Sequence, residues 1–221
     1  MGGEPLLNPD LKDICIAYRR LFSEKETKLR VITNGILVTK CPWLKELIQE
    51  YHVHIQVSLH VFTGKTKNEK LIKKVKEGLA LLEEWAGDAV RPADTKWGPY
   101  VEAKQKLNFQ VFYQGAGTQI KPFQHDDITG SKKHCTCPTL QLYKTKLYKC
   151  APIAYIGDVL EKFGGGEDPD WKPYLDYEPL RPDCSDDELV NFMKKQPQPE
   201  WTCKMCPPYA NVILSDEREI S

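Results

Sequence analysis

The sequence lacks an excess of charge of either sign. Its 31 lysines and arginines are matched by 31 aspartates and glutamates, so the formal net charge at pH 7 is +0. Nucleic acids and anionic membrane surfaces attract proteins through a positive field, and a balanced chain provides no such field overall. We therefore expect no nucleic acid among the partners of this protein.

Long apolar runs are missing too. No segment approaches the roughly 20 consecutive apolar residues that span a bilayer as a helix, and the first residues lack the basic-then-apolar layout of a secretory signal. We therefore expect a cytoplasmic protein with no membrane partner. Hydrophobic residues still make up 41% of the 221 residues, which is enough to bury a core.

Cysteine, by contrast, is frequent, with 8 in the chain. Because the cytoplasm keeps thiols reduced, metal binding or catalysis explains these residues better than disulfides do. Cys15 and Cys41 stand alone within or beside predicted helices, and we expect them to be structural, since an isolated buried cysteine behaves as a small apolar residue. All the others follow residue 134, and among them Cys184 is either a reserve metal ligand or a structural residue.

The first half of the chain alternates between apolar strands and amphipathic helices. Its patterns predict, in order, a helix after Asn8-Pro9-Asp10, a strand over 29–33, a helix from Pro42, a strand over 53–60, a helix over 68–85 and an apolar segment over 109–113. Strands and helices that alternate at these lengths are typical of parallel βα units.

The second half is richer in glycine and proline and offers only short elements. The patterns predict a hairpin over 140–148, although no glycine or asparagine supplies its turn, and a helix over 153–163. Ser185 and Glu188 form a capping box that opens one more helix. We place a domain boundary near residue 116, which gives one domain over 1–115 and a second over 116–221.

The cysteines of the second half are spaced for a metal ion or an iron–sulfur cluster. A Cys203-x-x-Cys206 turn aims two sulfurs at one centre. Cys137 and Cys150 bracket the predicted hairpin, and Cys135 lies beside them, so four or five ligands are available. Spacing alone leaves zinc and iron–sulfur both open, because soft sulfur suits either.

The order of these thiols, with a Cys-x-x-Cys at the end, resembles the twitch, or truncated SPASM, extension of radical S-adenosylmethionine (SAM) proteins. That extension has the pattern Gly-x4-Cys before the final pair, and Thr145 stands at the glycine position before Cys150. The resemblance implies a small loop-rich α+β domain that binds an auxiliary [4Fe-4S] cluster. Either Cys135 or Cys137 would be its first ligand.

The chain begins Gly2-Gly3-Glu4-Pro5 and continues into a helix and a strand, an order that resembles the GGEP region of the same family. The resemblance implies a partial (β/α) barrel in which Gly2, Gly3 and Glu4 meet the ammonium group of SAM. Ser58, on a later strand, would contact its ribose or carboxylate. Glycines let the backbone approach a ligand closely, and a carboxylate pairs with a cationic amine.

The Cys-x-x-x-Cys-x-x-Cys segment that precedes GGEP in radical SAM proteins is missing from this sequence. The chain therefore resembles the barrel without its first βα unit, and we expect SAM cleavage only if an upstream segment or a partner chain supplies that cluster. Complete relatives form a 5′-deoxyadenosyl radical that attacks a peptide or small-molecule substrate. The alternatives are a non-catalytic zinc or iron–sulfur interaction module, and a thiol–disulfide enzyme built on Cys203 and Cys206.

Two polar clusters have more than one explanation. Alternate residues of the predicted strand 53–60 share one polar face: His54, Gln56, Ser58 and His60. This face either lines a barrel cavity or meets solvent from an edge strand. The segment 125–127, His-Asp-Asp, suits a metal or acid–base cluster, and a solvated loop explains it as well. No residue is singled out as catalytic.

Overall fold

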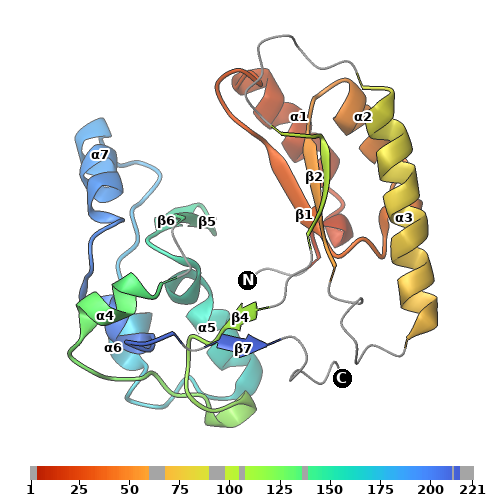
Figure 1. The fold of residues 1–221 in the computed structure, drawn as a ribbon. Coiled ribbons are helices and arrows are strands. Elements are labelled where there is room, and N and C mark those ends of the chain that lie inside the picture. Colours follow the sequence, from red (N-terminus) through yellow and green to blue (C-terminus); the bar gives the residue numbers. More distant parts are fainter. Residues whose placement is uncertain are drawn as a thin grey trace. The chain divides into compact units, whose positions relative to one another are not determined.

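The computed structural model describes residues 4–59, 68–89, 98–104, 108–135, 139–210 and 212–214. The chain divides into two compact units, and the division falls between Asn108 and Phe109, a few residues before the boundary predicted near 116. Figure 1 shows the helices and strands of both units. Each unit has its own hydrophobic core.

The N-terminal unit is built of parallel βα units. Its elements are the short turns η1 (Pro5–Leu7) and η2 (Val38–Lys40), the helices α1 (Leu11–Leu21), α2 (Leu44–Gln49) and α3 (Glu69–Gly87), and the strands β1 (Arg30–Thr33), β2 (His54–Ser58) and β3 (Val101–Lys104). The strands form one parallel sheet in the order β1-β2-β3, with Thr33 opposite Val57. Strands that follow each other in the chain lie side by side, so the predicted α/β alternation is confirmed.

The two faces of this sheet differ. Val31, Ile55 and Val57 are buried and share one core with residues of α2 and α3, the helices that lie beside the strands in Figure 1. The opposite face is more open, since Ile32 on β1 is 51% exposed. A barrel wall also has helices on one face and a cavity on the other. The three strands that the structure describes do not close, so the partial barrel stays a prediction.

The structure decides two points about the strands that the sequence left open. The third strand of the parallel sheet is β3, whose sequence Val-Glu-Ala-Lys gives little apolar signal, while the segment predicted over 109–113 begins in β4 (Asn108–Gln110), which pairs with β7 (Val212–Leu214). β2 is the central strand of the described sheet, which rules out an edge strand with a solvent-facing side. His54 is only 2% exposed. His60 lies outside the described residues.

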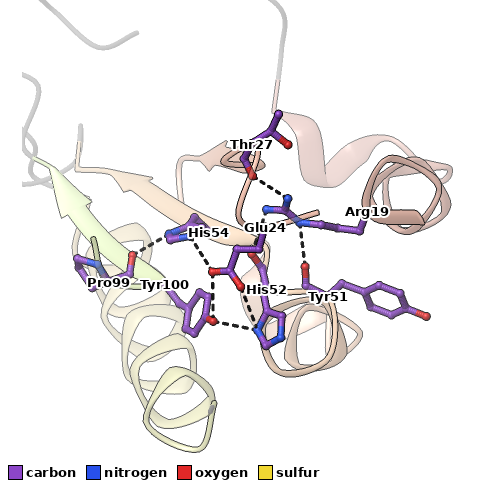
Figure 2. A network of polar contacts seen from close by, with 8 residues as sticks. All are labelled: Arg19, Glu24, Thr27, Tyr51, His52, His54, Pro99 and Tyr100. Atoms are coloured by element: carbon purple, nitrogen blue, oxygen red, sulfur yellow. Dashed lines mark hydrogen bonds and ion pairs between the residues drawn. The ribbon is translucent and has the colours of Figure 1, made fainter. Parts of the chain in front are cut away.

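A buried polar network joins the segments that enter these strands (Figure 2). The Arg19 guanidinium donates to the carbonyls of Tyr51 (3.0 Å) and His52 (3.3 Å), just before β2. His54 Nδ1 lies 3.0 Å from the Pro99 carbonyl oxygen, which can only accept, so Nδ1 holds the proton. This contact explains the burial of His54 and makes it a structural residue of the strand entry.

Glu24 is the acid of the same network. Its buried carboxylate accepts a hydrogen bond from the Tyr100 hydroxyl (3.4 Å) and lies 3.8 Å from His52 Nδ1 and 3.9 Å from His54 Nε2. A buried carboxylate is tolerated only with such partners. The network sits at the amino ends of the strands, the edge that contributes stability in α/β barrels, whereas ligands bind at the carboxyl ends.

The C-terminal unit consists of short elements. They are η3 (Gly117–Gln119), α4 (Ile128–Lys133), β5 (Gln141–Tyr143), β6 (Lys146–Tyr148), α5 (Ala151–Phe163), α6 (Lys172–Leu175), α7 (Asp186–Lys195) and η4 (Trp201–Met205). Seven side chains form its core: Ile120, Ile153, Ile156, Leu160, Trp171, Tyr174 and Met205. The predicted hairpin, β5–β6, and the capping box of Ser185 and Glu188 are both confirmed. No helix among the described residues combines the length and apolar character needed to cross a bilayer.

The hairpin turn leads to a prediction about glycine. Lys144 and Thr145 have φ of 46° and 64°, a left-handed conformation that strains a β-branched residue. We expect Thr145→Gly to raise the free energy of unfolding by up to about 1 kcal/mol by removing this strain, measured by thermal denaturation. Lys146→Gly, within β6, is the control and should lower stability. A loss of stability in both variants would contradict the prediction.

Candidate metal centre

Four of the predicted ligands lie around one cavity of the C-terminal unit. The cavity, of about 30 Å³, is lined by Cys135, Cys150, Cys203 and Cys206. These cysteines come from three separate segments: Cys135 is the second residue after α4, Cys150 directly precedes α5, and Cys203 and Cys206 lie in η4 and at its end. The structure thus brings together thiols that are far apart in the sequence. Cys137 lies outside the described residues, and Cys184 is half-buried and does not line the cavity.

Local structure places the sulfurs of the two later segments. Cys150 is the N-cap of α5, where the chain leaves the hairpin in an extended conformation before Ala151 begins the helix, and Pro152 follows in its first turn. Cys203 and Cys206 are joined by a turn in which the Cys206 N–H donates to the Cys203 carbonyl (3.2 Å). The side chain of Met205, which lies between the two cysteines, is fully buried in the core and fixes the turn to it.

Hydrogen bonds from the segment 123–131 fix the carbonyl side of that turn. The Gln124 N–H donates to the Lys204 carbonyl (3.0 Å), and the Phe123 N–H donates to the Met205 carbonyl (3.2 Å). The Cys206 carbonyl accepts hydrogen bonds from the side chains of His125 and Ser131. Three successive carbonyls are therefore held from outside the turn, which leaves its two sulfurs facing the cavity.

The Cys206 carbonyl oxygen lies 2.7 Å from His125 Nε2 and 2.9 Å from Ser131 Oγ. Because a carbonyl oxygen only accepts, His125 bears its proton on Nε2. Ser131 is buried on α4. His125 and Ser131 therefore support a cysteine through its backbone, a role that the sequence pattern did not predict for either of them.

The other residues of the segment 125–127 have partners of their own. The Lys204 ammonium lies 2.6 Å from Asp126 Oδ1, at the protein surface. Asp127 caps α4 by accepting from the Gly130 N–H (2.8 Å). These contacts favour the loop explanation of this segment over a metal or acid–base cluster.

Burial controls the protonation of the deepest thiols. Burial raises the pKa of Cys150 to about 11. A hydrogen bond from the Ile153 backbone opposes this rise, and the charges of Cys135 and Cys203 add less to it. Burial and the charges of the other three cysteines also raise the pKa of Cys206. Both thiols are therefore neutral at pH 7 without a cation. A bound cation would have to displace their protons, which makes affinity depend on pH.

A buried lysine ties two of the thiol segments together. Lys149 is 4% exposed, and its ammonium donates to the Gln198 carbonyl (2.6 Å) and lies 3.3 Å from the Glu200 carboxylate. Lys149 precedes Cys150, while Gln198 and Glu200 precede η4. This ion pair is buried on its lysine side and hydrogen-bonded, which is the condition under which such a pair is tolerated in a protein interior.

The donor set fits a soft metal, whereas the sulfur positions do not enclose an ion. Four thiols, two of them largely buried, are the ligands that zinc and iron–sulfur clusters share. Within the described part of the chain, however, no three His, Cys, Asp or Glu side chains lie close enough to hold one ion. Binding would therefore require the cysteine side chains to reorient around the cavity.

The hairpin turns through a residue in the left-handed conformation. Thr145 has a φ of 64°, a conformation that glycine favours, and lies five residues before Cys150.

A second candidate site lies at the carboxyl ends of the parallel strands. Glu4 Oε1 accepts from the Thr33 hydroxyl (2.6 Å) and Oε2 accepts from the Asn34 N–H (2.8 Å), at the end of β1. Ser58 ends the neighbouring strand, β2. Ligands of parallel α/β sheets bind at this edge. Gly2 and Gly3 lie outside the described residues.

The two cysteines of the N-terminal unit, Cys15 and Cys41, are buried in its core. Burial raises the pKa of Cys15 to about 11, and burial followed by the charge of Glu4 raises the pKa of Cys41. The expectation that both are structural is confirmed by this burial.

No protein-family model matches the sequence, and a search of curated proteins found no match. The resemblance to radical SAM proteins therefore rests on the motifs quoted above.

Proposed function

We propose that the C-terminal unit binds an iron–sulfur cluster through Cys135, Cys150, Cys203 and Cys206. The observation that supports this most is the convergence of these thiols, from three segments, on one cavity. The external hydrogen bonds that hold the Cys203–Cys206 turn add support, because metal ligands are commonly fixed by a second layer of contacts. Zinc is the competing metal for the same thiols.

An iron–sulfur cluster in this position would relay electrons or anchor a substrate. The four thiols would lose their protons to bind the cluster. The hydrogen bonds to the carbonyls would orient the Cys203–Cys206 turn. Lys149 would connect Cys150 to the residues just before that turn through its contacts with Gln198 and Glu200. Cys150 and Cys206 are half-buried, which limits the contact of their sulfurs with water. Exclusion of solvent is one of the means by which proteins set the potential of such a centre.

We further propose that the N-terminal unit is part of a SAM-binding barrel, in which Glu4, with Gly2, Gly3 and Ser58, meets the methionine end of the cofactor. The placement of Glu4 and Ser58 at the ligand-binding edge of the sheet supports this. Radical modification of a peptide or small molecule would then need a second cluster, supplied by an upstream segment or a partner chain.

One observation favours the alternative of a non-catalytic metal-binding module. The Glu4 carboxylate already accepts hydrogen bonds from the Thr33 hydroxyl, the Asn34 N–H and the Leu6 N–H. Its position is thus explained by the attachment of the chain start to β1, without any cofactor.

Anaerobic reconstitution with iron and sulfide tests the metal proposal directly. We expect a brown protein with about four irons per chain and the charge-transfer absorption of a cysteine-bound cluster. Stoichiometric zinc and no cluster would instead establish a zinc centre. Cys135→Ala and Cys137→Ala, made separately, would show which of these two cysteines is the fourth ligand.

Calorimetric titration with SAM tests the second proposal. We expect Glu4→Gln to weaken binding roughly tenfold, because a charge-assisted hydrogen bond to the ammonium group is lost. Glu26→Gln is a matched control, since Glu26 is exposed and its carboxylate accepts hydrogen bonds from the N–H and the hydroxyl of Ser23 in its own loop. An absence of SAM binding in the unaltered protein would favour the non-catalytic module.

A further inference from the structure

Six aromatic rings of the C-terminal unit form an unbroken row. In order they are Trp171, Tyr174, Trp201, Tyr177, Tyr148 and Tyr143. Neighbouring ring centroids are between 5.6 and 6.4 Å apart, which is the ordinary range of aromatic contact. Tryptophan and tyrosine are also the aromatic side chains that lose single electrons most readily, and rings in contact exchange electrons rapidly.

The middle of the row packs into the same core as two of the thiols, because Tyr174, Tyr177 and Tyr148 belong to the cluster that also contains Cys150 and Cys206. Trp201 begins η4, the turn that contains Cys203. Burial, and after it the charge of Cys206, raises the pKa of Tyr174 to about 12. Trp201 is also 45% exposed, so a small oxidant from the solvent can reach its indole.

The far end of the row has a proton acceptor. The Tyr143 hydroxyl donates a hydrogen bond to the Asp158 carboxylate, and the Lys144 ammonium lies 3.0 Å from the other carboxylate oxygen. A phenol that loses an electron also loses its proton. A carboxylate already in place to accept that proton makes Tyr143 easier to oxidise than a phenol without one.

We propose that this row carries oxidising equivalents from Trp201 to Tyr143, and so removes a one-electron radical oxidant from the neighbourhood of the thiols. The oxidant takes one electron from the Trp201 indole. Electrons then pass to Trp201 along Tyr177 and Tyr148, the Tyr143 O–H bond breaks, and its proton moves to Asp158. The net result is one electron gained by the oxidant and one electron and one proton lost by Tyr143.

The path does not depend on the proposed metal. Peroxide that meets reduced iron at the thiols would supply an oxidant of this class, but so would a radical that arrives from solvent. The test can therefore use the protein without metal. A failure of reconstitution would leave the path intact, and a failure of the path would leave the iron–sulfur proposal intact.

Azide radicals, generated by pulse radiolysis at neutral pH, oxidise tryptophan in preference to tyrosine and provide the probe. We expect the indolyl absorption to decay as phenoxyl absorption grows, at a rate independent of protein concentration. A nitroso spin trap followed by peptide mapping should place the adduct on Tyr143. Trp201→Phe and Tyr148→Leu should abolish that adduct, while Tyr209→Phe, an exposed tyrosine outside the row, should leave it unchanged.

Asp158→Asn removes the proton acceptor and leaves every ring in place, so its effect does not come from disturbed packing of the row. It should slow the growth of phenoxyl absorption and decrease the yield of the Tyr143 adduct. Equal labelling of Tyr143 in the unaltered protein and in Trp201→Phe would show direct oxidation from solvent and overturn the proposal. Unchanged kinetics in both Tyr143→Phe and Asp158→Asn would overturn it as well.

Discussion

Replacing Cys203 and Cys206 together by alanine is expected to abolish metal binding. Both thiols of the Cys-x-x-Cys turn are lost, and the remaining pair, Cys135 and Cys150, comes from segments that need that turn to complete a centre. Structural metals contribute to folding in domains with few long elements. We therefore also expect faster amide hydrogen exchange in the C-terminal unit, while α1 to α3 of the N-terminal unit keep their protection. Metal analysis and hydrogen exchange would measure the two effects.

Cys184→Ala is the matched control for this variant. Cys184 lies in the same unit, half-buried and away from the cavity, so its removal should leave the metal content unchanged. Full metal content in the double variant would show that these thiols are not ligands. A loss of metal in Cys184→Ala as well would indicate general damage to the unit.

Removing the side chains that hold the Cys206 carbonyl is expected to weaken metal binding without removing any ligand. His125→Leu and Ser131→Ala each delete one donor to this carbonyl. Contacts behind metal ligands typically change affinity by roughly 10–100-fold, and we expect losses in that range. Competition with a chromogenic chelator would measure them.

Asp126→Asn provides the comparison for these two variants. Asp126 belongs to the same loop, but its contact with Lys204 is an ion pair between two side chains at the surface. Such an ion pair contributes little to stability. We expect no change in metal affinity. If His125→Leu and Ser131→Ala also bound metal with unchanged affinity, the cysteines would not depend on the position of this carbonyl.

Local sequence patterns predicted many of the helices and strands. The amphipathic spacing of α3 and the capping box of α7 were sufficient to predict both helices, since each depends on residues within one or two helical turns. The hairpin was predicted from its apolar flanks, although its left-handed turn has no glycine. β3 escaped prediction because Val-Glu-Ala-Lys has too little apolar character, and only pairing with β2 makes it a strand.

The candidate site divides in the same way. The spacing of the Cys203-x-x-Cys206 turn indicated a metal centre, because the geometry of that turn is local. The roles of His125, Ser131 and Lys149 had no comparable signal, since their partners lie far away in the chain. His54 was placed on a polar face by alternation alone, and the segments before β1 and β3 cover it.

By itself, the sequence determined where helices and strands alternate, which thiols are available, and that Glu4 precedes the first described strand. Those properties follow from periodicity and from residue chemistry over short distances. Only the tertiary structure decided that four thiols from three segments share a cavity, and that Glu4 reaches the end of β1. Such convergence depends on contacts between segments far apart in the chain, which no local pattern encodes.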